Sequence, residues 1–578
     1  MAMTLIRRHG TALILAFLIG IICIAPYAYF TFTANYAGIA LTGQDAEEHY
    51  IARIQEVYDG YPATANVFFS HKDVPYMIPA LGEDMVAVAG KISGMTSVDI
   101  DTATKFFLPA LAFLLLYGLG LSLSRSRSAA LLGACLGILA SPTLMSAPHE
   151  LVNLLHGTSS ADGFYWARPI NPELSGAFLF GILWFMLHVF EMNKDTKYGT
   201  LRRFVAPVVV GLLTGMTLYI SIYIFLFLGM FLLLLLTQAL WYRRFGIAHG
   251  IFVAGIVGIL SAIPFLINYI HARALPGFAA ASIAQGAVPS HVPVLGLWIG
   301  VLLLIPLFLW PRHLPEVRSF FILCAVSLLI LLNQQLLTGT FLHPTHFHWY
   351  ITKPLAGLML GIFAVFLAER FIASYAVRVF LYALVIALCL VQNIFAQIHF
   401  YHIHTPDAIA AQAYAPLFTK LNSEPQAQTV FANRTLSLSI PMYTHDDAPN
   451  NFYAMFYYLP ASYLEKRLLF EYRLRGVTPD QALSTMESER IDISQRLFGT
   501  YWREANGSYE SLPDSILVSL AQHYQTYARN SISDDMRDLG IQVLVKDNTA
   551  DTWDLTEAGL TRATTVSDRF ELFVPDQK

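Results

Sequence analysis

The segment whose residues could most readily carry out chemistry contains three carboxylates within four residues, followed by a histidine. Asp45, Glu47, Glu48 and His49 follow shortly after an apolar stretch, residues 11–32. Carboxylates gain nothing from lipid, so a group of them beside an apolar stretch has either a solvation or a chemical purpose. A solvated surface loop is the simpler interpretation. In the chemical one, a carboxylate here accepts a proton as a general base, or two of them share a proton or bind a divalent cation.

A second candidate segment, residues 162–172, contains Arg168 after Tyr165 and Trp166. Arg, Trp and Tyr all favour the interface between membrane and water, so the segment could be an interfacial anchor. A guanidinium can also bind a lipid phosphate through two parallel hydrogen bonds. The sequence leaves both interpretations open.

A third group consists of His343, His346 and His348, followed by Lys353. Three histidines could bind a metal, but their spacing matches no fixed zinc pattern, so hydrogen bonding to a phosphate or a sugar is favoured. Asp99 and Asp101 form an Asp-x-Asp pattern before another apolar stretch. Because Asp101 precedes Thr-Ala-Thr at the start of a predicted helix, we interpret it as an N-cap rather than a metal ligand.

The composition places these groups in a membrane protein. Of 578 residues, 55% are hydrophobic and 13% are charged, whereas soluble proteins carry about 25% charged residues. The net charge of -4 gives no electrostatic case for a nucleic-acid partner. All cysteines fall in apolar segments, which excludes a disulfide framework: Cys23, Cys135, Cys324 and Cys389.

Hydropathy predicts about eleven transmembrane helices, the first of them retained rather than cleaved as a signal peptide. Basic residues fall in alternate loops, which places the N-terminus in the cytoplasm and the three candidate segments outside. We therefore expect a multi-pass protein of the plasma (inner) membrane. The predicted spans are 11–32, 104–123, 129–147, 173–191, 204–221, 222–240, 249–270, 292–310, 318–337, 354–369 and 376–397.

Two polar regions complete the expected architecture, an α-helical polytopic membrane domain over 1–398 and a soluble extracytoplasmic α/β domain over 399–578. The first outer loop, 33–103, contains two predicted surface helices, one starting near Asp45 and one over 78–92. In the C-terminal domain, short apolar stretches predict strands at 429–432, 439–443, 541–546 and 570–574. Helices are predicted at 451–475, 479–498 and 514–529.

The run from Asp45 to Ile54, Asp-Ala-Glu-Glu-His-Tyr-Ile-Ala-Arg-Ile, resembles the first outer loop of GT-C glycosyltransferases, a superfamily of polytopic membrane enzymes. A helix break at Tyr219-x-Ser-x-Tyr223, an arginine before a span, a late histidine-rich outer loop and an extracytoplasmic C-terminal domain agree with this. The chain lacks the Trp-Trp-Asp-Tyr-Gly motif, so it resembles the protein mannosyltransferase and aminoarabinose transferase branch more than oligosaccharyltransferase. It departs from that branch in having Asp-x-Glu-Glu in place of an Asp-Glu pair.

The resemblance implies an inverting transfer of a sugar from a polyprenyl-phosphate carrier to a glycan, lipid or protein acceptor. It implies that Asp45 is the base, with Glu47 or Glu48 sharing or taking over that role. If a divalent cation takes part, Asp45, Glu48 or His346 are its candidate ligands. The residues expected to bind the lipid phosphate or the substrate are His49, Arg168, Tyr219, Tyr223, His343, His346, His348 and Lys353.

Two other classes compete with this interpretation. Broken helices and polar residues within spans also occur in lipid or solute transporters and flippases. Against a transporter, the chain has no internal repeat, and its polar groups gather in the outer loops. A polysaccharide polymerase or ligase that uses a lipid diphosphate is the second rival. The observation that discriminates between the transferase and these two rivals is whether a monophosphate lipid binds beside Asp45.

Overall fold

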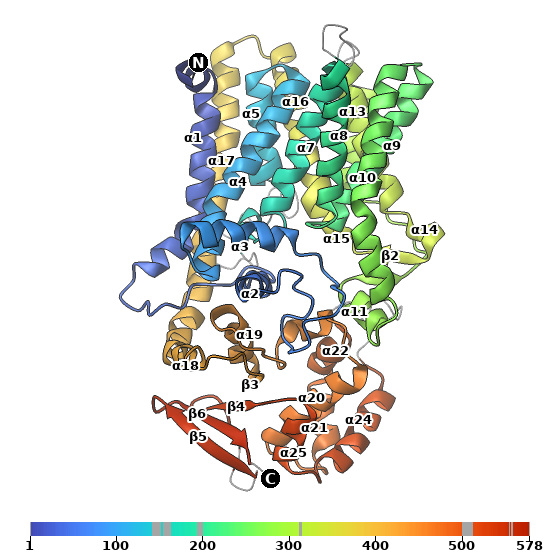
Figure 1. Cartoon of the computed structure of the whole chain (residues 1–578). Coiled ribbons are helices and arrows are strands. Elements are labelled where there is room, and N and C mark those ends of the chain that lie inside the picture. Colours follow the sequence, from blue (N-terminus) through green and yellow to red (C-terminus); the bar gives the residue numbers. More distant parts are fainter. Residues whose placement is uncertain are drawn as a thin grey trace.

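The computed structural model describes residues 2–140, 149, 152–153, 156, 163–192, 200–310, 315–499, 512–553, 555 and 559–576. Residue 162, at the start of the predicted Arg168 segment, lies outside this description. Long helices form a bundle at one end of the molecule, and the C-terminal elements lie at the other (Figure 1). The chain is an α-helical multi-pass membrane protein with a C-terminal part that contains a small sheet.

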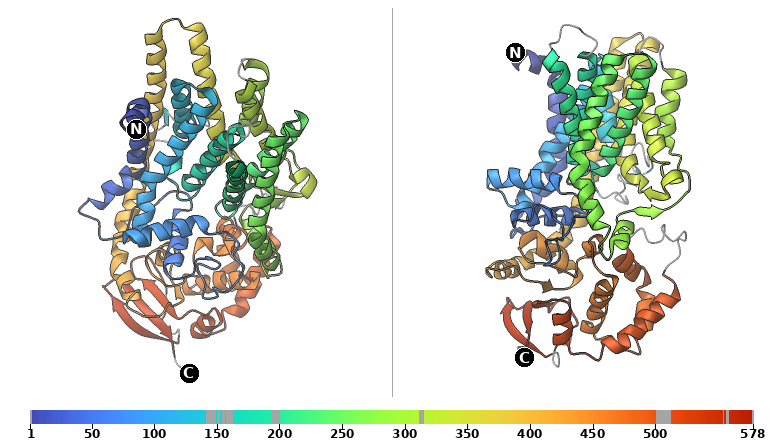
Figure 2. Two further views of the ribbon diagram at one scale, coloured as in Figure 1. Left: turned by 45° about the horizontal axis from the view of Figure 1, so that its top comes forward. Right: turned by 45° about the vertical axis from the view of Figure 1, so that its right-hand side comes forward.

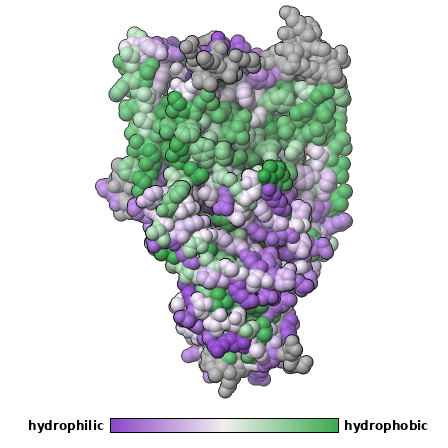
Figure 3. Space-filling view, turned by 60° about the vertical axis from the view of Figure 1, so that its left-hand side comes forward, coloured by the Kyte–Doolittle hydropathy of each residue, from purple (hydrophilic) through white to green (hydrophobic). Residues whose placement is uncertain are grey.

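In the described part of the chain, seven helices are long and apolar enough to cross a membrane, and four shorter apolar helices accompany them. Each of them overlaps one predicted span, but residues 141–147 of the predicted span 129–147 lie outside the described residues, and the number of helices that cross the membrane stays a prediction. On the face shown in Figure 3, apolar side chains form a belt across the bundle, with more polar surface beyond it. The helices are α1 (Ala2–Thr31), α4 (Ser97–Ser124), α5 (Arg127–Cys135) with the π-turn η1 (Leu136–Ala140), α7 (Glu173–Met192), α8 (Thr200–Thr217), α9 (Ile222–Trp241), α10 (Phe245–Ala272), α12 (Leu297–Leu304) with η3 (Ile305–Leu309), α13 (Pro315–Leu331), α16 (Lys353–Phe371) and α17 (Tyr375–Ala411).

Small residues and paired polar side chains hold the bundle together. A Cβ on Gly361 in α16 would lie 2.3 Å from Gly133 Cα in α5, so the two helices approach closely because neither residue has a side chain. Asn393 in α17 donates a hydrogen bond of 2.9 Å to the Leu139 carbonyl, which satisfies a buried amide. The predicted helix break near Tyr219 is confirmed, since α8 ends at Thr217 and α9 begins at Ile222.

The first loop folds across one end of the bundle, which we call the loop side. Its two predicted helices are confirmed as α2 (Glu47–Tyr58) and α3 (Leu81–Ser93). Both lie between the bundle and the C-terminal elements (Figures 1 and 2). Shorter elements on the same side are η2 (Tyr165–Ala167), α11 (Phe278–Ala284), β1 (Ala287–Pro289) paired antiparallel with β2 (Thr340–Leu342), α14 (Gln335–Thr338), α15 (Pro344–Phe347) and η4 (His348–Thr352).

The C-terminal part begins without a break, because α17 continues past residue 398 to Ala411. Its sheet has the order β3-β4-β6-β5, with β3 parallel to β4 and the other pairs antiparallel. The strands are β3 (Val430–Phe431), β4 (Val543–Asp547), β5 (Leu560–Val566) and β6 (Phe570–Pro575). The helical elements are η5 (Gln412–Tyr414), α18 (Ala415–Leu421), α19 (Arg434–Tyr443), η6 (Phe452–Phe456), α20 (Ala461–Leu474), α21 (Ala482–Ser488), α22 (Arg490–Phe498), α24 (Asp514–Tyr527) and α25 (Ile532–Asp538).

One predicted strand is wrong. Residues 439–443 belong to helix α19, whose N-cap Asn433 accepts a hydrogen bond of 3.0 Å from the backbone N–H of Leu436. Leu436 and Ile440 are then buried one turn apart on the same face. The cap and the helical spacing of the apolar residues outweigh the short alternating pattern that indicated a strand.

Candidate active site

Glu47, the first residue of α2, fixes the acidic segment in place. Its Oε2 accepts hydrogen bonds of 2.8 Å from the backbone N–H groups of Gly43 and Gln44. Its Oε1 lies 3.0 Å from Lys105 Nζ in α4, and both side chains are buried. Buried charges are tolerated when they are paired and hydrogen bonded, so this contact ties the segment to the bundle. The geometry gives Glu47 a structural role and leaves neither oxygen open for chemistry.

Lys105 also pairs with Asp101, and its Nζ lies 4.8 Å from the centroid of the Tyr27 ring. The prediction that Asp101 caps a helix is wrong. Helix α4 begins earlier, and its N-cap is Thr96, whose side chain accepts the backbone N–H of Asp99. Asp101 therefore lies within the helix, where it balances the charge of the buried lysine.

Asp45 lies on the outward side of the same segment, next to Arg168. The Asp45 side chain is 78% exposed, and its Oδ2 lies 3.0 Å from Arg168 Nη2, whose side chain is only 10% exposed. Arg168 Nε also donates a hydrogen bond of 2.8 Å to the backbone carbonyl of Asp45. One guanidinium thus holds both the backbone and the carboxylate of Asp45.

Arg168 also contacts two further elements, η4 and α2. Its Nη1 donates to the hydroxyl of Tyr350 in η4, and its guanidinium carbon lies 5.7 Å from the ring centroid of Tyr50 in α2. The segment before it is anchored by Gln397 in α17, whose Oε1 accepts the backbone N–H of Phe164 at 2.9 Å. An interfacial anchor extends its cation toward lipid headgroups. These contacts instead favour a fixed cation inside a built site.

Glu48 is the second acid of this site. Burial, followed by the negative charge of Glu47, raises the pKa of Glu48 to about 7. Tyr453 from η6 stacks on the neighbouring His49, and burial, followed by the charges of Glu48 and Asp45, raises the pKa of that phenol. A carboxyl group that titrates near neutral pH can either give or take a proton at low cost.

His49 joins the first loop to the C-terminal part. Its ring stacks on Tyr453 with centroids 4.8 Å apart, and its Nε2 lies 2.8 Å from the hydroxyl of Tyr457. Burial, together with the charges of Arg53 and Arg168, lowers the pKa of His49, so the ring is neutral. This packing supports a structural role for His49, and its predicted substrate contact stays a prediction.

Three other predicted residues gather around the Tyr350 contact of Arg168. The His346 ring stacks on Tyr350 at 5.2 Å and meets Tyr223 at 4.5 Å, and His343 lies 5.6 Å from His346. Burial lowers the pKa of His343 to about 4, so that ring too is neutral. His346 Nδ1 is buried without a hydrogen-bond partner among the described residues. These rings form a polar aromatic wall next to the guanidinium.

The remaining predicted residues lie at the edge of this wall or away from it. Lys353 Nζ lies 2.9 Å from the centroid of the Trp349 ring, and His348 meets the same ring edge-on. Tyr219 is separate, because its hydroxyl donates to the Ser261 carbonyl at 2.9 Å and its own carbonyl accepts the backbone N–H of Leu81. Tyr219 therefore connects the turn after α8 to α10 and α3.

Among the residues that the structure describes, no three histidine, cysteine, aspartate or glutamate side chains come close enough together to hold a metal ion. The candidate ligands Asp45, Glu48 and His346 do not form such a group. A divalent cation in this site stays a prediction.

Sequence reasoning missed three residues that shape the site, namely Tyr350, Gln397 and Tyr453. Tyr350 lies two residues after His348, so its place near the histidine-rich loop could have been predicted from the sequence. A glutamine inside an apolar span, as at position 397, is costly unless paired and was a usable signal. Nothing in the sequence connects Tyr453 with the first loop.

No known protein-family model and no curated protein matches the chain. Among 13 matching chains in solved structures are two of ArnT from Cupriavidus metallidurans, one bound to undecaprenyl phosphate and one in the apo state. The first is 12% identical, with a TM-score of 0.39, over 77% of this chain and 85% of that one. The second is 12% identical, with a TM-score of 0.38, over 73% and 83%. The chemistry of the site rests on its own contacts rather than on this similarity.

Proposed function

We propose that the protein is a membrane glycosyltransferase that moves a sugar from a polyprenyl-phosphate carrier to a glycan, lipid or protein acceptor. The reaction takes place at the outer face of the plasma (inner) membrane, where the first loop and the residues after 399 lie. The observation that carries the proposal is the ion pair between the enclosed Arg168 and the exposed Asp45. It joins an anion-binding cation and an accessible carboxylate at the end of an apolar bundle.

A lipid phosphate fits this position better than a soluble anion. Its polyprenyl chain can stay beside the apolar belt of the bundle while its headgroup reaches the loop side. The guanidinium fork of Arg168 matches two phosphate oxygens, and the neighbouring Tyr350 hydroxyl fixes its orientation. The phosphate takes the place of the Asp45 carboxylate on Nη2, which releases Asp45 from its ion pair.

The released carboxylate then accepts the proton of the attacking acceptor hydroxyl or amine. The acceptor atom forms a bond to the anomeric carbon as the bond from that carbon to the phosphate oxygen breaks. The electron pair leaves with the lipid phosphate, and Arg168 stabilises the added negative charge. Attack opposite the leaving group inverts the anomeric carbon. Glu48 follows Asp45 by three residues and, with its pKa of about 7, is the alternative base.

Asp45→Asn tests the role of Asp45, because it keeps the shape and hydrogen bonding of the side chain but cannot accept a proton. Loss of a general base lowers the rate by about 10²–10⁴. The assay measures label transferred from a panel of undecaprenyl-phosphate-linked hexoses and amino sugars to acceptors in membranes that contain the protein. Asp73→Asn is the matched control, an exposed aspartate in the same loop.

Transfer by Asp45→Asn within a few-fold of wild type rejects Asp45 as the base. If Glu48→Gln alone is inactive, the transferase assignment stands and the base is Glu48. If the wild type transfers no sugar from any donor yet moves the lipid between leaflets, the protein is a flippase.

A further inference from the structure

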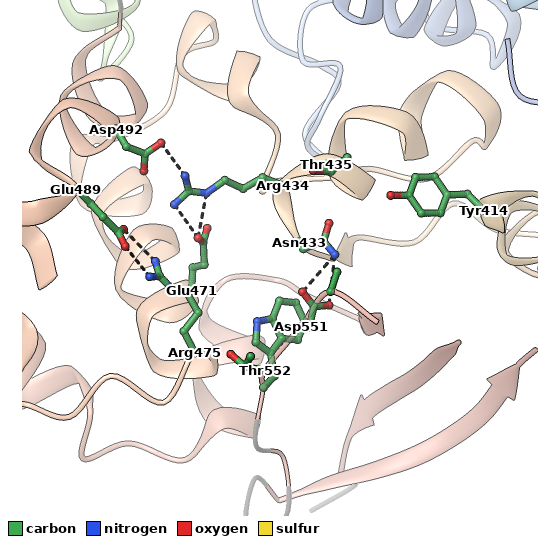
Figure 4. A pocket seen from close by; sticks show the side chains of 12 residues that line it. Tyr414, Asn433, Arg434, Thr435, Glu471, Arg475, Glu489, Asp492, Asp551 and Thr552 are labelled. Carbon is green, nitrogen blue, oxygen red and sulfur yellow. Dashed lines mark hydrogen bonds and ion pairs between the residues drawn. The ribbon is translucent and has the colours of Figure 1, made fainter. Parts of the chain in front are cut away.

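The C-terminal part contains a cavity of about 570 Å³ that shares no residue with the candidate active site. Its size lies within the range of roughly 300–1,000 Å³ that is usual for small-molecule sites. Side chains from α19, α20, α22 and the segment after β4 converge on it (Figure 4). The lining residues are Tyr414, Asn433, Arg434, Thr435, Glu471, Arg475, Glu489, Asp492, Ala550, Asp551, Thr552 and Trp553.

Ion pairs fix the planar polar groups of this cavity. Arg434 contacts Glu471 at 2.8 Å and Asp492 at 2.7 Å. Arg475 holds Glu489 through two hydrogen bonds of 2.5 and 2.9 Å. A group that is already held in place loses little conformational freedom when a ligand binds. Asp492 Oδ2 has no hydrogen-bond partner among the described residues, so this carboxylate keeps lone pairs that a ligand can use.

A similar arrangement occupies the opposite side of the cavity. Asn433 caps α19 with its side-chain oxygen, while its Nδ2 donates to Asp551 at 3.2 Å. Burial raises the pKa of Asp551 to about 6, so this carboxyl group is ionised at neutral pH but accepts a proton in mild acid. Trp553, which is largely buried, adds an apolar surface beside these polar groups.

The balance of charge excludes an anionic ligand. The lining contains four carboxylates and two arginines, and both arginines are engaged by carboxylates. Burial opposes the ionisation of Glu471, but the charges of Arg496 and Arg434 lower its pKa to about 2. A phosphate or a uronic acid would have to displace these carboxylates in an already negative cavity.

We propose that this cavity binds a neutral or amino-bearing saccharide. A sugar hydroxyl donates to one carboxylate and accepts from an arginine or amide N–H, which is the mixed pattern that the paired groups present. The amine of an amino sugar matches the excess of carboxylates, and the apolar face of a sugar ring fits against Trp553. The cavity is a second saccharide site in the chain, in addition to the proposed transfer site.

The experiment applies the labelled full-length protein, in lipid nanodiscs, to an array of neutral, amino-bearing and acidic glycans. We expect binding to neutral or amino-bearing glycans and none to acidic ones. Ala550→Trp fills the cavity from an exposed lining position and should weaken this binding at least tenfold. Ala563→Trp, at an exposed position of β5 outside the lining, is the matched control and should bind as wild type does.

Asp492→Asn provides a second variant if Ala550→Trp fails to fold. It preserves shape but removes one charge, and it should weaken binding of amino-bearing glycans several-fold more than binding of neutral ones. No bound glycan, a preference for acidic glycans, or undiminished binding by Ala550→Trp overturns the proposal. Because the assay measures binding without sugar transfer, its result is independent of the transferase proposal.

Discussion

Replacing Arg168 with lysine separates binding of a lipid phosphate from simple anchoring at the membrane interface. Lysine keeps the positive charge but cannot present two parallel N–H donors, so one of the two hydrogen bonds to the phosphate is lost. A hydrogen bond to a charged group contributes about 1.5–3 kcal/mol. Since 1.4 kcal/mol is a factor of ten, we expect binding about 10- to 150-fold weaker. The nearby Tyr350 contact, which orients the fork, is lost as well.

The assay is titration of undecaprenyl phosphate onto the purified protein in lipid nanodiscs, read as a dissociation constant. Arg273→Lys is the matched control, because Arg273 is an exposed cation at the loop-side end of α10. It should bind as the wild type does, and thermal unfolding should confirm that both variants are folded. A dissociation constant for Arg168→Lys within threefold of wild type refutes the reasoning and returns Arg168 to an anchoring role.

Three further results are expected. Asp45→Asn should bind undecaprenyl phosphate up to about fivefold more tightly, because the competing ion pair has an exposed carboxylate and contributes only about 0.2–1 kcal/mol. Weaker binding would show that Asp45 does not compete with the phosphate for Arg168. Because the pKa of Glu48 is about 7, its carboxyl group is neutral below that pH and negative above it. Binding of a polyprenyl-phosphate sugar, whose phosphodiester keeps one negative charge over this range, should therefore weaken between about pH 6 and 8. Glu48→Gln should remove this step, and an unchanged step assigns the titration to another group. Glu47→Gln removes one of the two carboxylates that pair with the buried Lys105 and should cost about 1–3 kcal/mol of stability, because Asp101 still balances the lysine. A thermal midpoint equal to wild type would show that this pair does not hold the loop.

The sequence predicted the elements whose patterns are local. Apolar stretches located the spans, and the acidic run located the start of α2. It did not predict how the three acids divide their roles. Because α2 begins at Glu47, this residue faces the bundle and meets Lys105, whereas Asp45 precedes the helix and remains exposed. Successive residues of a helix point about 100° apart, so a shift of one residue in the helix start redistributes these roles.

Contacts between distant parts of the chain could not be predicted from the sequence. The partners of His49 are 404 and 408 residues away, at Tyr453 and Tyr457. A neutral, stacked histidine and a solvated one look alike in a sequence, because only the fold determines which rings surround them. Arg168 was recognised as a candidate, but the pairing that links it to Asp45 depends on how the first loop folds back over the bundle.

The contact between His49 and Tyr457 has a consequence for how the protein is made. At about 5–20 residues per second, the ribosome needs roughly 20–80 s to reach Tyr457 after it has added His49, a separation of 408 residues. During that time the first loop lacks one of the surfaces against which it packs. The acidic segment therefore reaches its final form only after the bundle and the start of the C-terminal part have been synthesised. A nascent chain that stalls earlier carries Asp45 and Arg168 but not the complete site.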